Sequence, residues 1–377
     1  MSKFRSFSVV TVLICFVLVI GTAAPARAAS GDITVVASGL NNPRGLNFGP
    51  NGRLFVAEAG SGGDGLCAPG PEGLRCYGNS GSITRINLST GVQTRLVTGI
   101  PSLAGEDGSF ASGTQDVEFQ GLGKMFFSIG YGGDPLNREV DFGPEGANLD
   151  QLGRVMPSGN WKLVTDLGDF EVAANPTGDE VDSNPYGVLA LPGKTIVADA
   201  GANDMLQRNA NGEILVLATF PNRMADAPPF LGLPPGTQIP MDQVPTSVAL
   251  GPDGYYYVGT LTGFPFPVDG AIVYRVAPEG GTPEVVATGL THIIDLTFGA
   301  DGSLYVLEIA KNGLLAAFGS GDWTGALIKV ASDGTQTEIA SEGLYAPGGV
   351  AIGRDGAFYV TNNSISSGTG EVLRIEP

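Results

Sequence analysis

One short pattern recurs six times along the chain: an apolar run, a tight turn ending in glycine, and a second, aromatic-rich apolar run. The four clear copies span residues 45–56, 247–258, 295–306 and 349–360, and the two divergent copies span residues 116–127 and 187–197. Asn-Gly and Asp-Gly pairs in the turns supply the positive φ that closes a hairpin, so each copy predicts two antiparallel strands. A single hairpin cannot bury its own faces, and hairpins repeated at a fixed period pack radially as propeller blades.

The two apolar runs that follow each hairpin complete a four-stranded blade, except at the end of the chain. There, residues 371–375 form a third strand with no fourth behind it. Residues 33–40 resemble the last strand of the fourth blade at 284–290, so we expect them to complete the sixth blade and remove the open edge. The predicted fold is all-β: a six-bladed propeller of four-stranded antiparallel sheets over residues 33–377, forming one domain closed by its N-terminal strand.

The connections between strands are longer than six blades require, since a four-stranded blade needs only about 40 to 45 residues. Most of the surplus lies after the second strand or before the first, and these positions open on the same end of the ring. The long connections are residues 58–80, 100–114, 130–152, 166–185, 221–244, 259–270 and 308–325. Long loops on one face of a rigid scaffold predict a binding face there.

The first 28 residues have the pattern of a secretory signal. Lys3 and Arg5 precede a run at 9–20 that is apolar except for Thr11, and Ala26-Arg27-Ala28 fits a cleavage site. The alternative is a membrane anchor, but the run is shorter than the roughly 20 residues that a spanning helix needs. We therefore expect residues 1–28 to be removed, leaving a secreted or periplasmic protein with no membrane span.

The chain is acidic, with 38 Asp and Glu against 20 Lys and Arg and a net charge of −18. Such a surface repels nucleic acid and favours cations or neutral and basic ligands, although acidity also simply keeps an exported protein soluble. Outside the signal the cysteines are Cys67 and Cys76. In an oxidising compartment a disulfide between them is favoured over two free thiols, and they lack the nearby histidines of a zinc site.

A set of oxygen-bearing side chains is predicted at the loop-rich end of the ring. The residues six positions after the last glycine of each turn are Glu58, Ile129, Asp199, Thr260, Glu308 and Asn362. Asp182, Asn184, Asn203 and Asp204 lie in neighbouring turns. Calcium takes six to eight oxygen ligands of this type, so a metal site is one interpretation. The other is that these side chains cap turns and satisfy backbone groups.

Other candidate chemistry is sparse. His292 is the only histidine and the only candidate for a histidine general base, but its isoleucine neighbours favour a structural role. The sequence lacks the nucleophile elbow, zinc-protease, phosphate-loop and dinucleotide motifs in a suitable context, which argues against the familiar hydrolases and nucleotide enzymes. Phe264, Phe266 and Trp323 add apolar surface at the same end of the ring, suited either to a flat ligand or to loop packing.

Several motifs together resemble the ScyD/ScyE family over nearly all of the expected mature chain. They are Asn42-Pro43-Arg44-Gly45, Asp182-Ser183-Asn184-Pro185-Tyr186-Gly187, the segment 197–204, Val244-Pro245-Thr246-Ser247-Val248 and the segment 261–267. The resemblance implies an exported propeller of the NHL type, and the family takes its name from gene clusters for the sunscreen pigment scytonemin.

The chain also resembles, more distantly, six-bladed calcium-dependent lactonases and phosphotriesterases. That resemblance implies a metal held by Glu58, Asp199, Asn203 and Asn362. The chain departs from the pattern in blade two, where the matching position is Ile129, and in blade four, where it is Thr260.

These observations lead to three functional hypotheses. The first is an exported module that binds a small molecule or protein at its loop face, linked to biosynthesis of a scytonemin-like pigment and acting as a monomer. The second is a calcium-dependent lactonase or esterase with its metal at the channel mouth, and the third is a purely structural or protein-interaction module. The candidate ligand-binding residues are Asp182, Asn184, Asp204, Glu308, Phe264, Phe266 and Trp323.

Overall fold

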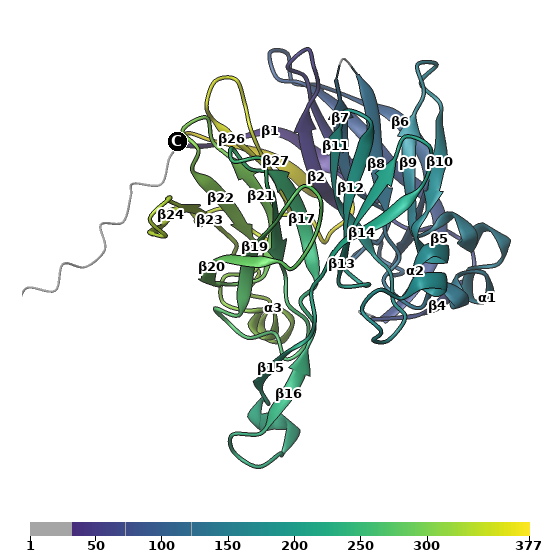
Figure 1. Ribbon diagram of the computed structural model, residues 1–377. Helices are drawn as coiled ribbons and strands as arrows, with labels where there is room; N and C mark the ends of the chain where they lie inside the picture. Colours follow the sequence, from purple (N-terminus) through teal and green to yellow (C-terminus); the bar gives the residue numbers. More distant parts are fainter. Residues whose placement is uncertain (1–31, 72, 122) are drawn as a thin grey trace, which may run out of the picture.

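Six antiparallel blades are arranged around a central axis in the computed structural model, which describes residues 32–71, 73–121 and 123–377 (Figure 1). Each has four strands, and the sheet of blade one gains a fifth, short strand from a connection. The six-bladed, all-β propeller predicted from the repeat is therefore confirmed. The proposed signal, residues 1–28, lies outside the described residues.

The first three blades follow the chain order. Blade one contains β2 (Pro43–Phe48), β3 (Leu54–Glu58), β5 (Gly73–Asn87) and β6 (Val92–Ala104). Blade two contains β7 (Thr114–Gln120), β8 (Lys124–Ile129), β9 (Gln151–Val155) and β10 (Trp161–Asp166). Blade three contains β11 (Pro185–Leu191), β12 (Lys194–Asp199), β13 (Asp204–Asn209) and β14 (Ile214–Thr219).

The last three blades repeat the pattern. Blade four contains β17 (Pro245–Leu250), β18 (Tyr256–Thr260), β19 (Ala271–Val276) and β20 (Glu284–Leu290). Blade five contains β21 (Ile293–Phe298), β22 (Leu304–Glu308), β23 (Ala326–Val330) and β24 (Gln336–Ala340). Blade six contains β25 (Gly349–Ile352), β26 (Phe358–Asn362), β27 (Gly370–Ile375) and β1 (Ile33–Leu40).

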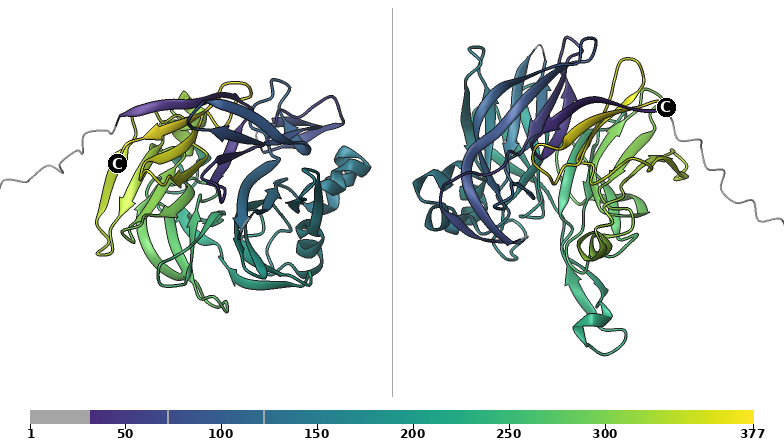
Figure 2. Two further views of the ribbon diagram at one scale, coloured as in Figure 1. Left: turned by 90° about the horizontal axis from the view of Figure 1, so that it is seen from above. Right: turned by 180° about the vertical axis from the view of Figure 1, so that it is seen from behind.

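The N-terminal strand closes the ring as predicted. β1 pairs antiparallel with β27, with Ile33 opposite Ile375 and Leu40 opposite Gly370. Figure 2 shows this strand, in purple, running beside the yellow C-terminal strands. Because β1 and β27 share one sheet, the third strand of blade six is paired on both sides, and the ring cannot open without breaking this pairing.

The hydrophobic core lies between neighbouring blades and not within one sheet. Tyr256 of blade four, for example, is 1% exposed and packs in one cluster with Met205 and Phe220, which come from blade three and the segment after it. Aromatic and β-branched side chains on the second strands fill these spaces, which explains the composition of the repeat. The first strand of each blade contacts the first strands of its neighbours, so β2, β7, β11, β17, β21 and β25 surround the central channel.

The long connections contain more regular structure than predicted, and they gather at one end of the ring (Figure 1). They contain β4 (Cys67–Gly70), η1 (Pro135–Asn137), α1 (Arg138–Phe142), η2 (Pro144–Asn148), α2 (Leu167–Ala174), β15 (Arg223–Asp226), η3 (Pro229–Leu231), β16 (Gln238–Met241) and α3 (Leu314–Ser320). β15 and β16 form a separate two-stranded hairpin that projects from this end. β5 and β6 also run beyond their blade toward it, because the β4 and β5 pairing extends the sheet.

A disulfide joins Cys67 to Cys76, as predicted. The two residues face each other across β4 and β5, so the bond fastens the hairpin that extends blade one. None of the helices in the described ranges is both long and apolar enough to cross a membrane.

Candidate functional site

A cavity of about 220 Å³ lies where the central channel opens toward the long connections. Its floor comes from the first strands of five blades, and its sides and cover come from the connections. Residues that line it include Arg44, Gln115, Asn184, Tyr186, Thr246, Phe110, Phe266, Phe318 and Trp323. A cavity of this size suits a small ligand of one or two rings.

The floor of the cavity comes from a single position of the repeat. Counting back eight residues from the last glycine of each turn, or seven in the shortened third copy, gives Arg44, Gln115, Tyr186, Thr246, Ile294 and Gly348. The first five line the cavity, and the sixth has no side chain. The repeat places these six positions at the same height in the ring, so the five side chains determine the chemistry at the channel mouth.

Three aromatic rings from distant parts of the chain meet over the cavity, and we call Phe110, Phe318 and Trp323 the aromatic roof. The Phe110 centroid lies 6.0 Å from that of Phe318 and 5.9 Å from that of Trp323, and the latter two are 5.1 Å apart. Phe110 precedes β7, whereas Phe318 lies in α3 of blade five. Trp323 is buried while Phe318 is 54% exposed, so the roof has a solvent-facing edge.

Several buried polar atoms of the cavity have no hydrogen-bond partner within the described chain. They are Arg44 Nε, Gln115 Oε1, Asn184 Oδ1 and the Tyr186 hydroxyl. The Gln115 and Asn184 amides both lie against Gly130, where a Cβ would stand 2.2 Å from Asn184 Oδ1. Burial raises the pKa of Tyr186, and the nearby Arg44 charge opposes that shift. Unsatisfied buried polar groups are costly, so their presence points to water or a ligand as their partner.

The residues predicted at the ends of the second strands have a shared structural role. Four of them accept a hydrogen bond from a main-chain N–H just before the first strand of their own blade. The donors are Asn41 to Glu58 at 2.7 Å, Asn184 to Asp199 at 2.6 Å, Thr291 to Glu308 at 2.7 Å and Tyr345 to Asn362 at 2.7 Å. Each side chain thus fixes the entry of the chain into its blade, as the turn-capping interpretation predicts.

The four predicted metal ligands are divided among three blades. Glu58 in blade one forms an ion pair with Arg95 at 2.9 Å and also accepts hydrogen bonds from Ser82 and Thr84. Asn362 in blade six donates to the Gly343 carbonyl. Asp199 and Asn203 lie in blade three, where Asn203 accepts from the Val244 N–H at 2.8 Å. Within residues 32–71, 73–121 and 123–377, no three His, Cys, Asp or Glu side chains are grouped so that they could hold a metal ion.

A dense acidic region lies between blades two and three, beside the cavity. Burial, followed by the Asp199 charge, raises the pKa of Asp204 and of Asp150 well above the usual range. The same two causes raise the pKa of Glu171 to about 7 and that of Asp182 to about 6. The carboxylate oxygens of Asp150, Glu171 and Asp204 have no hydrogen-bond partner in the described chain.

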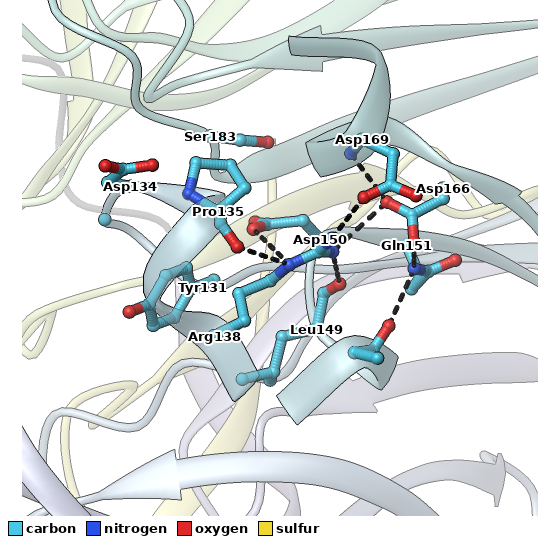
Figure 3. A network of polar contacts seen from close by, with 12 residues as sticks. Tyr131, Asp134, Pro135, Arg138, Leu149, Asp150, Gln151, Asp166, Asp169 and Ser183 are labelled. Carbon is cyan, nitrogen blue, oxygen red and sulfur yellow. Dashed lines mark hydrogen bonds and ion pairs between the residues drawn. The ribbon is translucent and has the colours of Figure 1, made fainter. Parts of the chain in front are cut away.

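Arg138 is the cation of this region (Figure 3). Its guanidinium donates to the Pro135 and Leu149 carbonyls at 3.1 and 2.7 Å. It also pairs with Asp166 at 3.1 Å and Asp169 at 2.9 Å, and lies 4.0 Å from Asp150. Arg138 is 4% exposed, so one buried charge joins α1, the residues just before β9 and the start of α2.

The structure divides the predicted ligand-binding residues into two groups. Asn184, Phe266 and Trp323 line the cavity. Asp182, Asp204, Glu308 and Phe264 are not among its lining residues: Asp182 accepts from the Gly133 N–H and Glu308 caps its blade. Phe264 is 39% exposed and contacts Phe230 in the segment between β15 and β16. The prediction missed Arg44, Gln115, Tyr186, Phe110 and Phe318, although the first three share a repeat position that can be counted in the sequence.

His292 is fully buried, with its Nδ1 donating to the Leu261 carbonyl at 2.7 Å. Burial lowers its pKa, so the ring is neutral near pH 7. It packs against Phe266 and supports the wall of the cavity from behind. This position fits the structural role favoured by its sequence neighbours.

A second acidic set lies further down the channel. Burial raises the pKa of Asp116 to about 6, and burial together with the Asp116 charge raises those of Glu118 and Asp295 to about 8. Asp116 accepts from the Val188 N–H and Asp295 from the Val350 N–H, both at or below 2.8 Å. Each therefore links the first strand of its blade to the first strand of the next.

The chain is similar in structure to other proteins of this architecture. A putative gluconolactonase aligns with a TM-score of 0.51 and 12% identity, covering 93% of each chain. A glucose dehydrogenase aligns with a TM-score of 0.50 and 14% identity, over 92% of this chain and 99% of that one. Virginiamycin B lyase from Staphylococcus aureus aligns with a TM-score of 0.49 and 13% identity, over 92% and 99%. At these identities the likeness shows the fold alone.

No protein-family model and no curated protein matches the sequence. The resemblance to the ScyD/ScyE family therefore rests on its motifs.

Proposed function

We propose that this protein is an exported, monomeric propeller that binds a small aromatic molecule in the cavity under the aromatic roof. The observation that carries the proposal is a 220 Å³ cavity that combines the roof with buried, unpartnered polar atoms. Aromatic rings provide stacking surface, and a few fixed polar groups orient a ligand. A disulfide supports an oxidising compartment, and the ScyD/ScyE resemblance supports a role in scytonemin-like pigment biosynthesis.

Trp323 offers a direct readout of binding, because the chain has only one other tryptophan, Trp161. In a W161F variant, excitation at the red edge reports on the roof alone. We expect p-cresol to protect Trp323 from acrylamide quenching, and cyclohexanol, of similar size but without an aromatic ring, to protect it less. F110A should weaken p-cresol binding about three- to tenfold, since ring pairs contribute about 0.5–1.5 kcal/mol.

The matched control is F230A, which removes a phenylalanine that is 66% exposed near the projecting hairpin, away from the cavity. It should bind p-cresol as the parent does. Equal protection of Trp323 by p-cresol and cyclohexanol would contradict an aromatic site under the roof. An equal loss of p-cresol affinity in F110A and F230A would also contradict it.

Calcium-dependent hydrolysis of a lactone or ester is the second candidate function, and calcium binding stays a prediction. Bound calcium would polarise the carbonyl and activate water. The Glu58 carboxylate is already neutralised by Arg95, so it fits this role poorly. The favourable observation lies in blade three, where Asp204 is fully buried beside the predicted ligand Asp199 and its oxygens lack partners. With Glu171, it offers two carboxylates for a cation completed by carbonyl and water oxygens.

We expect that, if calcium binds there, the melting temperature will rise in millimolar calcium relative to chelator, because an ion that binds only the native state stabilises it. D204N should remove this response, whereas D333N, at an exposed turn, should keep it. An unchanged melting temperature in calcium would remove the calcium-dependent hydrolase from consideration.

A further inference from the structure

Arg44 is a buried cation without an anionic partner. It is 9% exposed and lines the cavity. Its Nη2 donates to the Ala111 carbonyl at 2.7 Å, its charge acts on the neighbouring Tyr186 hydroxyl, and its Nε has no hydrogen-bond partner in the described chain. No ion pair within 4.0 Å joins it to a carboxylate of the described chain. The contrast is Arg138, which is also buried but pairs with two carboxylates.

Proteins normally place a carboxylate next to a buried guanidinium, and Arg44 has none among the described residues. Five N–H donors lie on a rigid fork that matches a carboxylate or phosphate in a bidentate arrangement, and here the Nε donor has no acceptor in the described chain. The nearest channel carboxyls, Asp116 and Asp295, follow Gln115 and Ile294 on their strands, and each is already bonded to main-chain N–H groups. The unpartnered Nε is therefore available to a ligand in the cavity that Arg44 lines.

The side-chain amides of Gln115 and Asn184 line the cavity together with Arg44. Gln115 is 2% exposed, and its Oε1 is unpartnered, as is Asn184 Oδ1. A side-chain amide presents an N–H₂ donor as well as a carbonyl acceptor, so Gln115 and Asn184 can complete the contacts of a planar anionic group. These polar groups lie on the floor, opposite the aromatic roof.

We propose that the cavity selects ligands that carry a carboxylate or similar anion on an aromatic ring, with the anion bound by Arg44 and the ring under the roof. This inference rests on the proposed function and adds its ligand class. It runs against the net charge of −18, which by itself disfavours anions. A buried, local cation outweighs that distributed charge because exposed charges are screened by solvent and salt.

The test uses three probes with one ring system: indole-3-acetate, its neutral isostere indole-3-acetamide, and the cation tryptamine. Isothermal titration of the full mature chain at pH 7.5 should give a dissociation constant for the acetate on the order of ten- to a hundredfold below that for the amide, as expected for a charge-assisted bond. Tryptamine should bind weakest. In R44Q the constants for acetate and amide should become nearly equal.

R354Q is the matched control, because Arg354 is exposed in a turn of blade six and bonds the Pro50 carbonyl. It should keep the preference for the acetate. Equal binding of all three probes by the parent protein would overturn the role of Arg44 while leaving the aromatic site intact, and binding of none would overturn both. If R44Q does not fold, the acetate-to-amide ratio of the parent protein still decides the question.

Discussion

The melting temperature of this protein is expected to fall as the pH rises from 5 to 8.5. The buried channel carboxyls are the reason: burial raises the pKa of Glu118 and Asp295 to about 8 and that of Asp116 to about 6. In the unfolded chain these groups lose their protons near pH 4. Between pH 4 and 8 the native state therefore holds more protons than the unfolded state, and its stability declines as the pH increases.

The size of the effect follows from the shifts. One pKa unit corresponds to about 1.4 kcal/mol, so together these groups contribute on the order of several kcal/mol across the window. For a chain of this length that lowers the melting temperature by about 5 °C or more. Differential scanning calorimetry at half-unit pH steps measures it.

D295N isolates the origin of this pH dependence, because it resembles the protonated carboxyl and cannot ionise. The variant should show a flatter profile between pH 5 and 8.5. D301N is the control: Asp301 is exposed and its bond to Lys329 lowers its pKa to about 2, outside the window. A parent profile that is flat or that rises toward pH 8.5 would show that the channel carboxyls are ionised in the native state.

R138M is expected to destabilise the protein by about 3–5 kcal/mol, the range found when one partner of a buried ion pair is removed. The change withdraws the cation that lies 4.0 Å from the fully buried Asp150 and opposes the rise of its pKa (Figure 3). It also removes the partner of Asp166, which is partly buried, and of Asp169, which is largely exposed. It also leaves the Leu149 carbonyl without its donor. Urea unfolding at pH 7.5, followed by circular dichroism, gives the free energy.

A double variant separates lost charge from lost packing. D150N in the R138M background removes one of the uncompensated carboxyls, so it should recover part of the stability. The control K311M breaks the exposed pair between Lys311 and Glu338 and should change stability by less than about 1 kcal/mol. If R138M also changes the free energy of unfolding by less than about 1 kcal/mol, the carboxyls of the acidic region are protonated without Arg138.

The architecture could be predicted because its signals are local. The Asp-Gly and Asn-Gly turns define hairpins within about ten residues, and the match between residues 33–40 and 284–290 identified the closing strand without any tertiary information. The pairing of Cys67 with Cys76 was equally local, since the two face each other across adjacent strands.

The candidate site was predicted only in part. The prediction used a repeat position at the end of the second strand, whereas the side chains that line the cavity come from a position on the first strand. Counting forward from the turn leads to Glu58 and Asn362 on second strands, where they bond the backbone of their own blades. Counting backward leads to Arg44 and Tyr186 on the first strands, which surround the channel. Both positions recur six times, so periodicity alone does not tell which one faces the mouth.

The sequence by itself determined the number of blades, the closure of the ring and the end on which the long connections gather, because turns and strand alternation act over a few residues. Only the tertiary structure decided which side chains share the cavity. Phe110 and Phe318 meet there from distant parts of the chain, and Arg44 lines it without an anionic partner among the described residues. Such contacts depend on how six sheets pack around one axis, and no local pattern of residues encodes that packing.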